Sequence, residues 1–305
     1  MAVKSPVKIK ATNGQVVTKS AAPVVKRAEI KKTWKMYIDG KFPRTESGRY
    51  YVLKDAAGTV IANICKGSRK DLRDAVVSNR KAQEGWAKRS AYNKGQILYR
   101  IAETLEGRKA QFVETLLMQG TSHAKAQAEV ESTIDLLVYY AGWTDKYIQI
   151  FSSVNPVESA HFNFSYPEAC GIVSVFATEQ NGLLGLVSMI APIIAGGNTC
   201  TVMAAELFPM TAIDFAEVMH ASDVPSGVVN ILTGPRKEFL SHASSHMDIN
   251  AIVYADLTSA DQKLAQINAS LNVKRVIDFS KEALLSPYRI FQCQETKTTW
   301  HPVGI

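Results

Sequence analysis

Residues 171–203 of the 305-residue chain read GIVSVFATEQNGLLGLVSMIAPIIAGGNTCTVM. This stretch decides the fold, because two short apolar segments (172–176 and 199–203) flank an apolar helical segment (183–195). Apolar runs of about five residues are typical of strands that are buried on both faces of a sheet. Two such strands joined by a helix predict a parallel pair with a crossover connection.

The same alternation continues to residue 279. Further strands are expected at 228–232, 251–254 and 274–278, and amphipathic helices at 210–221, 237–244 and 259–270. Five strands with four helical crossovers predict the α/β class, with a doubly wound Rossmann-type parallel sheet and helices on both of its faces.

The part of the chain before residue 147 is expected to begin with strands and to continue with helices. Residues 34–65 are rich in β-forming side chains and are interrupted by turn signals. Ser68 and Asp71 form a capping-box pattern in front of an amphipathic helix. Apolar spacing predicts further helices that include residues 96–105 and 125–146.

Two segments are expected to form strands outside the parallel sheet. Residues 147–166 alternate apolar and polar side chains around Asn155-Pro156, a pattern typical of a β-hairpin with at least one polar face. Residues 288–300 form a final strand-like segment. Both are therefore predicted to project an alternating surface.

The formal net charge of +7 comes from the N-terminal tail. Residues 1–33 contain seven Lys and Arg27 against a single acid, Glu29, so the rest of the chain is neutral. The tail lacks helical periodicity and is predicted to be disordered, with a targeting or docking peptide as the alternative. Few aromatic residues lie among its charges, so no specific nucleic-acid binding is expected.

Hydropathy and cysteine usage both favour a cytoplasmic location. No uncharged apolar run reaches the roughly 18 residues that a membrane-spanning helix needs, so no membrane partner is expected. The four cysteines (Cys65, Cys170, Cys200 and Cys293) contain no C-x-x-C pair, which suits a reducing compartment.

A series of motifs in a fixed order resembles the N-terminal half of aldehyde dehydrogenases, from about Trp34 to Val276. The motifs are YIDGKF (37–42), VLKDAAGTVIANI (52–64), GQILYRIAETLE (95–106), YYAGWTDKY (139–147), YPEACGIVSVF (166–176), APIIAGGNT (191–199), PSGVVNILTG (225–234), SHMDINAIVY (245–254) and NVKRV (272–276). The resemblance implies that residues 34–146 and 171–280 form a nicotinamide-cofactor domain and that residues 147–170 and 286–305 form an oligomerisation arm. The tail (1–33) precedes both.

In the family a catalytic domain with the nucleophilic cysteine follows this point. Here the chain passes instead to RIFQCQETKTTWHPV (289–303), which is similar to the family's last segment, the second part of the arm. The chain therefore resembles a shortened member that lacks the catalytic domain, similar to the degenerate downstream half of tandem-domain aldehyde dehydrogenases.

At most of the positions that align with the family's cofactor motifs, this chain has a different residue from the family. Thr178-Glu179-Gln180 stands where the family has P-W-N, so an amide is kept but lies one methylene further out. Met203 replaces the lysine of K-P-S-E, and only Glu206 matches the ribose-facing glutamate. Glu206 is thus the single candidate cofactor-binding residue, and a solvated carboxylate at a helix N-terminus is the alternative.

The phosphate region is expected to be hostile to a dinucleotide. Leu240 stands where the family has glycine and is expected to obstruct close backbone approach, and Asp256 would place a negative charge and a self-made cap at a helix N-terminus. Glu282 is displaced by three positions from the family's general base. No cofactor is therefore expected, with NAD(P) as the alternative.

No catalytic residue and no metal site are predicted. Cys170 and Cys200 lie at or in expected core strands, where a thiol is inert. His242 and His246 stand four residues apart on an expected helix but have no third ligand nearby. The chain is accordingly expected not to be an enzyme.

Three functions follow. The favoured one is a non-catalytic subunit, structural or regulatory, that associates through its arm with a complete aldehyde dehydrogenase or with itself. The second is an NAD(P)-binding component of an aldehyde oxidoreductase. The third is an unrelated enzyme in the same cleft, which no residue supports.

Overall fold

The centre of the protein is a five-stranded, fully parallel sheet. The computed structural model describes residues 30–55 and 57–304, and the part from Lys32 onward forms one compact unit. The strand order is β10-β9-β6-β7-β8. The strands are β6 (Ile172–Phe176), β7 (Thr199–Met203), β8 (Val229–Leu232), β9 (Ala251–Tyr254) and β10 (Arg275–Asp278). The prediction of an α/β fold with a doubly wound sheet is confirmed.

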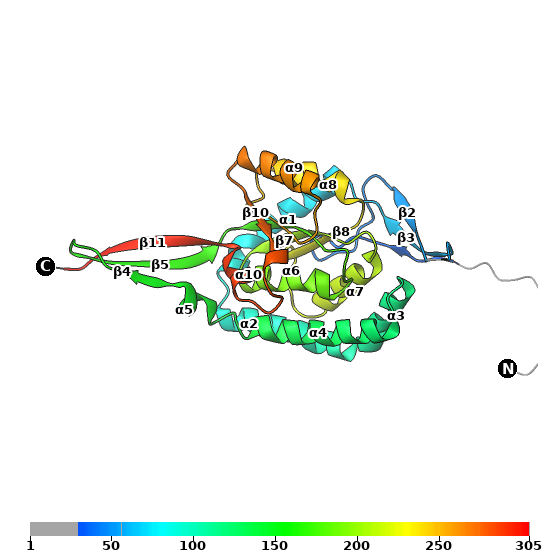
Figure 1. Cartoon of the computed structure of the whole chain (residues 1–305), viewed down its shortest axis with the longest axis horizontal. Coiled ribbons are helices and arrows are strands. Elements are labelled where there is room, and N and C mark those ends of the chain that lie inside the picture. Colours follow the sequence, from blue (N-terminus) through cyan, green and yellow to red (C-terminus); the bar gives the residue numbers. More distant parts are fainter. Residues whose placement is uncertain (1–29, 56, 305) are drawn as a thin grey trace, which may run out of the picture. The chain divides into compact units, whose positions relative to one another are not determined.

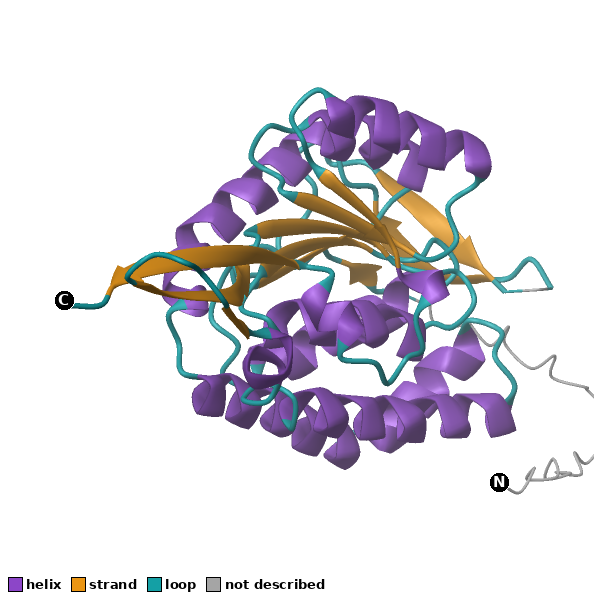
Figure 2. Ribbon diagram, turned by 60° about the vertical axis from the view of Figure 1, so that its left-hand side comes forward, coloured by secondary structure: helices purple, strands orange, loops and turns teal. Residues whose placement is uncertain are grey.

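Helices cover both faces of this sheet (Figures 1 and 2). One face carries α1 (Arg69–Ala87), α8 (Arg236–Ser245) and α9 (Ser259–Ser270). The other carries α6 (Leu184–Ala195) and α7 (Pro209–His220), which are covered in turn by α2 (Ala91–Gly107), α3 (Lys109–Met118) and α4 (His123–Ala141). None of the helices in the described part of the chain combines the length and hydropathy needed to cross a bilayer.

The apolar strands divide their side chains between two cores. Val173 and Val175 belong to the cluster that includes α6, α7 and the outer helices, whereas Ile172 and Phe176 belong to the cluster beneath α1 and α8. This division follows from the period of two along a strand, because successive side chains point to opposite faces. A strand that is buried on both faces is therefore mainly apolar. The buried polar residues of the inner strands are few: Ser174, Thr199, Thr201 and Asn230.

Helix α1 begins and docks as its sequence predicts. The capping box is formed: the Asp71 N–H donates to Ser68 Oγ at 3.3 Å, and the Ser68 N–H donates to Asp71 Oδ2 at 2.7 Å. Further along, the buried Asn79 amide donates to the carbonyls of Cys200 (3.1 Å) and Gly227 (2.8 Å). These bonds join α1 to the starts of β7 and β8.

A small second sheet precedes the helices. Its order is β1-β3-β2, with β1 (Thr33–Trp34), β2 (Tyr50–Lys54) and β3 (Val60–Cys65). Tyr37 and Ile231 exchange backbone hydrogen bonds of 2.9 and 2.7 Å, which tie this region to β8. Of the predicted disordered tail, residues 1–29 lie outside the described residues, and Thr33 already belongs to β1.

A three-stranded antiparallel ribbon projects from the body, to the left in Figure 1. We call it the arm; it consists of β4 (Ser153–Asn155), the central β5 (His161–Ala169) and β11 (Gln294–Pro302). The pairing of β11 with β5 runs without interruption from Gln294 opposite Ala169 to Pro302 opposite His161. The predicted hairpin with its turn after Asn155 is present.

Three predicted segments are wrong in part. Residues 147–151, expected as a strand, form the short helix α5 (Tyr147–Phe151), and the expected strand at 288–300 begins with the helix α10 (Tyr288–Phe291). The rings of Phe151 and Phe291 stack at 4.5 Å, so each short helix is fixed by packing against the other rather than by its own alternation. Helix α4 ends at Ala141, five residues before the predicted end.

Candidate functional site

The carboxyl ends of the parallel strands bring the predicted site residues together. The loops after β6, β7 and β9 carry Glu179, Glu206 and Asp256, and Arg236 is the first residue of α8, after β8. These four residues are joined in one network of side-chain and backbone hydrogen bonds, which we call the edge network. This edge is where doubly wound folds place their ligands, so it is the first candidate site.

Arg236 is the centre of the edge network. Its Nη1 donates to Asp256 Oδ1 at 2.8 Å, and its Nη2 lies 3.1 Å from Glu179 Oε1 and also donates to the Ala177 carbonyl. Only 13% of the Arg236 side chain is exposed, against 17% for Asp256 and 26% for Glu179. A largely desolvated guanidinium thus holds two carboxylates from different loops.

The carboxylates of the edge network also accept from backbone N–H groups. Asp256 Oδ2 accepts from Thr178 Oγ1 at 2.9 Å and from the Glu179 N–H at 2.6 Å. Glu179 in turn accepts from the N–H groups of Glu206 (2.8 Å) and Leu207 (3.0 Å). The turns that could present free N–H groups to an anion are therefore already bonded to the chain's own acids.

Each crossover helix has an N-terminal N–H group that donates to a side chain of this same protein. The acceptors are Glu129 for α6 (2.6 and 3.0 Å), Gln119 for α7 (3.0 Å), Glu206 for α8 (2.9 Å) and Thr258 for α9 (3.2 Å). Helix N-termini bind phosphate through unsatisfied N–H groups and a favourable dipole. Here that capacity is used internally.

The nicotinamide dinucleotide that the resemblance implies does not fit these residues. Its pyrophosphate would meet three carboxylates (Glu179, Glu206 and Asp256). The single guanidinium there is already engaged by Glu179 and Asp256, and Glu206 accepts from the Arg236 backbone N–H. Like charges about 4 Å apart repel by about 4 kcal/mol at an effective dielectric of 20. The hydroxyl of Tyr51 is buried beside these acids and has no hydrogen-bond partner among the residues that the structure describes; burial, followed by the charges of Glu206 and Glu179, raises its pKa.

Within the edge network, the Glu206 carboxylate lies at the N-terminus of α8, whereas the cap of α9 that was expected from Asp256 is made by Thr258. The other residues at the family's cofactor motifs lie apart from this network. Leu240 and Met203 are buried in the core beneath α8, so the Leu240 side chain does not face a ligand at the edge, contrary to expectation. Glu282 accepts from Ser286 and Gln292 in the connection to the arm.

Sequence reasoning missed Arg236 and Glu129. Arg236 had a signal: a basic residue directly follows the Gly234-Pro235 turn, four residues after the end of β8, while the acids come two to three residues after the ends of their strands. Glu129 lies in the middle of α4, and nothing local marks it. Burial raises the pKa of Glu129, while the N–H groups of Leu183 and Leu184 oppose this.

A cavity of about 610 Å³ adjoins the loop after β6. Gln180 and Asn181 line it together with Glu129 and Lys125 of α4. The Gln180 side chain is exposed here, and its backbone N–H donates to Thr178 Oγ1 at 3.2 Å. The predicted amide is therefore next to a cavity, but it is not part of the edge network.

The four cysteines are free and buried. Burial raises the pKa of Cys170 to about 12, and burial likewise raises the pKa of Cys200 and of Cys293. The burial of Cys170 and Cys200 agrees with the prediction that these two thiols are inert, and Cys293 is buried in the same way.

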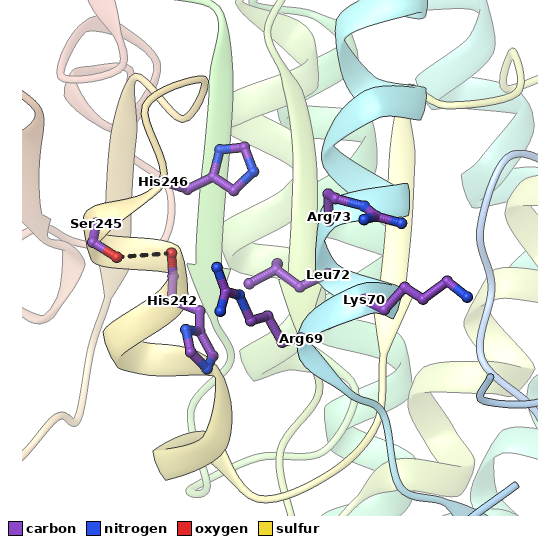
Figure 3. Close-up of a pocket in the computed structure, with 7 residues that line it drawn as sticks. All are labelled: Arg69, Lys70, Leu72, Arg73, His242, Ser245 and His246. Atoms are coloured by element: carbon purple, nitrogen blue, oxygen red, sulfur yellow. Dashed lines mark hydrogen bonds between the residues drawn. The ribbon is translucent and has the colours of Figure 1, made fainter. Parts of the chain in front are cut away.

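The two histidines that the sequence singled out share a groove between α1 and α8 (Figure 3). His242 and His246 face it together with Arg69 rather than with a third metal ligand. Across residues 30–55 and 57–304, no group of three or more His, Cys, Asp or Glu side chains is arranged to hold a metal ion.

One face of the arm is polar, as predicted. Asn155 Nδ2 donates to Asn163 Oδ1 at 2.6 Å and to Ser165 Oγ at 2.8 Å, and Ser165 Oγ lies 2.8 Å from Thr298 Oγ1. These bonds cross all three strands and fix their register.

The opposite face of the arm is aromatic. Phe162, Phe164 and Tyr166 alternate along β5, with neighbouring ring centroids 5.5 and 5.9 Å apart. Together with Val154 they line a hollow of about 330 Å³, and Val154 is 68% exposed. The outer edge of β11 pairs with no other strand in the described part of the chain. The arm is thus an amphipathic ribbon with an open edge.

Comparisons with known proteins identify relatives of this chain. The model of the aldehyde dehydrogenase family matches residues 42–278. The omega-crystallin of Enteroctopus dofleini is 30% identical over 259 residues, which cover 83% of this chain and 51% of that protein. An aldehyde dehydrogenase of Aspergillus niger is 29% identical over 245 residues, covering 79% and 48%. The chain therefore spans about half the length of these relatives.

Solved structures share the fold. The NAD⁺ complex of an aldehyde dehydrogenase from Bacillus cereus superposes with a TM-score of 0.76 at 23% identity, covering 80% of this chain and 50% of that one. HpcC from Thermus thermophilus superposes equally well, with a TM-score of 0.76 and 23% identity, covering 80% and 47%.

These comparisons correct the expectation that the chain is not an enzyme. The relatives include named dehydrogenases, among them the benzaldehyde dehydrogenase of Antirrhinum majus, which is 28% identical over 250 residues. The match covers only part of each, so this span assigns no catalytic state to the chain. With a family model that matches most of its length and relatives of up to 30% identity, the chain belongs to the aldehyde dehydrogenase family.

Proposed function

We propose that the chain is an aldehyde-dehydrogenase-family component that associates through its arm with a complete aldehyde dehydrogenase. The observation that carries this proposal is the open outer edge of β11, which extends over nine residues on a ribbon that projects from the body. The partner surface that fits is the edge of a sheet in the other subunit.

The open edge supports strand addition. Of the nine residues of β11, three (Glu295, Lys297 and Pro302) are of the kinds that commonly block such edges and six are not, and β5 already occupies the inner side. An unpaired row of N–H and C=O groups gains main-chain hydrogen bonds when a further strand is added.

The aromatic face adds a reason for specificity. Phe162 is 45% exposed although its ring packs, tilted, against that of Phe164, so a partner that covers this face would bury apolar surface. At about 25 cal/mol per Å², covering about 100 Å² of apolar surface contributes about 2–3 kcal/mol before the cost of association. On the other face, the side-chain hydrogen bonds Asn155–Asn163 and Ser165–Thr298 hold the three strands together in the absence of a partner.

The family's cofactor is a weaker candidate ligand for this span. The edge network engages the N–H groups and the guanidinium that a pyrophosphate would need, which favours association over dinucleotide binding. We propose accordingly that the component acts without a dinucleotide of its own. Its cytoplasmic location stays a prediction.

The test is co-expression with a complete aldehyde dehydrogenase from the same cell, followed by native mass spectrometry. The expected result is a defined heteromer. Phe162→Glu should weaken it strongly, because a charge would be buried against an apolar surface. Thr296→Glu is the matched control, since Thr296 is exposed on the polar face of β11.

Two results would contradict the proposal. One is a chain that stays separate from the complete enzyme at micromolar concentration. The other is a heteromer that Phe162→Glu and Thr296→Glu affect equally, because the contact would then not depend on the aromatic face.

A further inference from the structure

A basic groove lies between the first turn of α1 and the last turn of α8, away from the edge network. Its volume is about 440 Å³. The residues that line it are Arg69, Lys70, Leu72, Arg73, His242, Ser245 and His246. No acidic side chain is among them.

The cations of the groove differ in whether they are already paired. Lys70 lies 2.6 Å from Glu46, and Arg73 lies 3.0 Å from Asp74. For Arg69 no carboxylate of the described residues is within ion-pair distance. This is the reverse of the edge network, where the single guanidinium is shared between two acids.

The two imidazoles flank the Arg69 side chain (Figure 3), whereas Lys70 and Arg73 point to the other side of α1. His246 Nδ1 accepts from the Asp248 N–H at 3.2 Å, so the neutral ring carries its proton on Nε2. Burial lowers the pKa of His246, and the positive charges of Lys274 and Arg69 lower it further while Asp248 opposes them. The ring is therefore close enough to the Arg69 charge to be affected by it, and an anion bound to Arg69 would oppose that effect.

The floor of the groove is apolar. Leu72 is 1% exposed and lies beside the Arg69 guanidinium. A ligand that fills the space thus needs an anionic group for Arg69 and the imidazoles and a carbon skeleton for Leu72. A singly charged carboxylate would satisfy Arg69 alone, whereas a phosphate offers three acceptor oxygens and a second charge.

We propose that this groove binds a small organic phosphate, with the phosphate group between Arg69 and His246 and the carbon skeleton over Leu72. Arg69 makes the principal contact, because its planar fork matches two phosphate oxygens. The site is separate from the arm, so it can be tested without the partner.

The test is calorimetric titration of the whole chain with phenyl phosphate, inorganic phosphate and benzoate. Phenyl phosphate should bind most tightly, since it alone has both the dianion and the apolar body. Arg69→Ala should weaken it by about tenfold or more, the loss expected for a charge-assisted bidentate contact. Lys81→Ala removes one exposed positive charge from the same helix outside the groove and should change the affinity by less than about twofold.

A second readout follows the His246 ring by NMR. Bound phenyl phosphate should raise the pKa of His246, and this rise should be lost in Arg69→Ala. Equal losses in Arg69→Ala and Lys81→Ala would show diffuse attraction and overturn the proposal. Benzoate binding as tightly as phenyl phosphate would overturn the phosphate assignment, and no saturable binding of either phosphate at millimolar concentration would overturn the site.

Discussion

Replacing Arg236 by methionine should cost the fold far more than replacing an exposed arginine. The change keeps the side-chain stem but removes the donors to Asp256 Oδ1, Glu179 Oε1 and the Ala177 carbonyl. Two carboxylates that are 17% and 26% exposed then lose their cation. Breaking a buried pair costs about 3–5 kcal/mol, and the remaining exposure here reduces this to about 3 kcal/mol.

Urea unfolding of Arg236→Met and of the wild type measures this loss, and the melting temperature should fall by about 6 °C. Arg100→Met is the matched control, because Arg100 pairs with Asp223 where both side chains are more than half exposed. Its cost should stay below about 1 kcal/mol. The double variant Arg236→Met/Asp256→Asn should lose less stability than the sum of the two single variants, and this difference, the coupling energy, should be about 1–3 kcal/mol. Equal costs for Arg236→Met and Arg100→Met would refute the idea that the network holds the four loops together.

Three further outcomes are expected. Calorimetry with NAD should show no saturation at micromolar concentration. Micromolar affinity would contradict the conclusion that a dinucleotide does not fit the edge network. Burial raises the pKa of Asp214 from 3.8 to about 6, so the folded state retains its proton and the free energy of unfolding falls as the pH rises from about 4 to 6. Asp214→Asn should remove this fall. In urea melts, the free energy of unfolding of the variant relative to that of the wild type should therefore increase by about 2 kcal/mol between pH 4 and pH 7. Gly171→Ala should destabilise by about 2 kcal/mol in the same melts, because Gly171 has φ +125° and an added Cβ would lie 2.3 Å from Asn250 Oδ1, which accepts from the Ile172 N–H.

The elements of the parallel sheet could be predicted because their signals are local. The helix at 259–270 is observed with the same bounds, since Thr258 and Asp261 cap it and the first turn is specified by neighbours in sequence. The prediction of a strand at residues 147–151 was wrong for the opposite reason, because the deciding contact is distant in sequence. Five residues that alternate YIQIF carry no helical signal, and the contact of Phe151 with Phe291 is 140 residues distant along the chain.

The candidate site shows the same limit in its charges. The sequence places Glu179, Glu206 and Asp256 in loops that follow strands, and the strand pattern alone brings those loops to one edge. The sequence does not show whether an acidic side chain at this edge is free to repel a phosphate or is already bound by a basic side chain of the protein. That depends on Arg236, whose guanidinium reaches across from the loop after β8 to the loops after β6 and β9.

This distinction decides what the conserved architecture can be used for. A ligand site at strand ends needs donors that are satisfied only when the ligand binds, because bonds already made inside the protein must be broken first. At this edge the acceptors are supplied internally, by Glu179 and Asp256 for the loops and by Glu206 for α8. On the arm the reverse holds, since β11 has one paired side and one open side. Unused bonding capacity, rather than fold class, is therefore the ground on which we propose the arm as the surface for association.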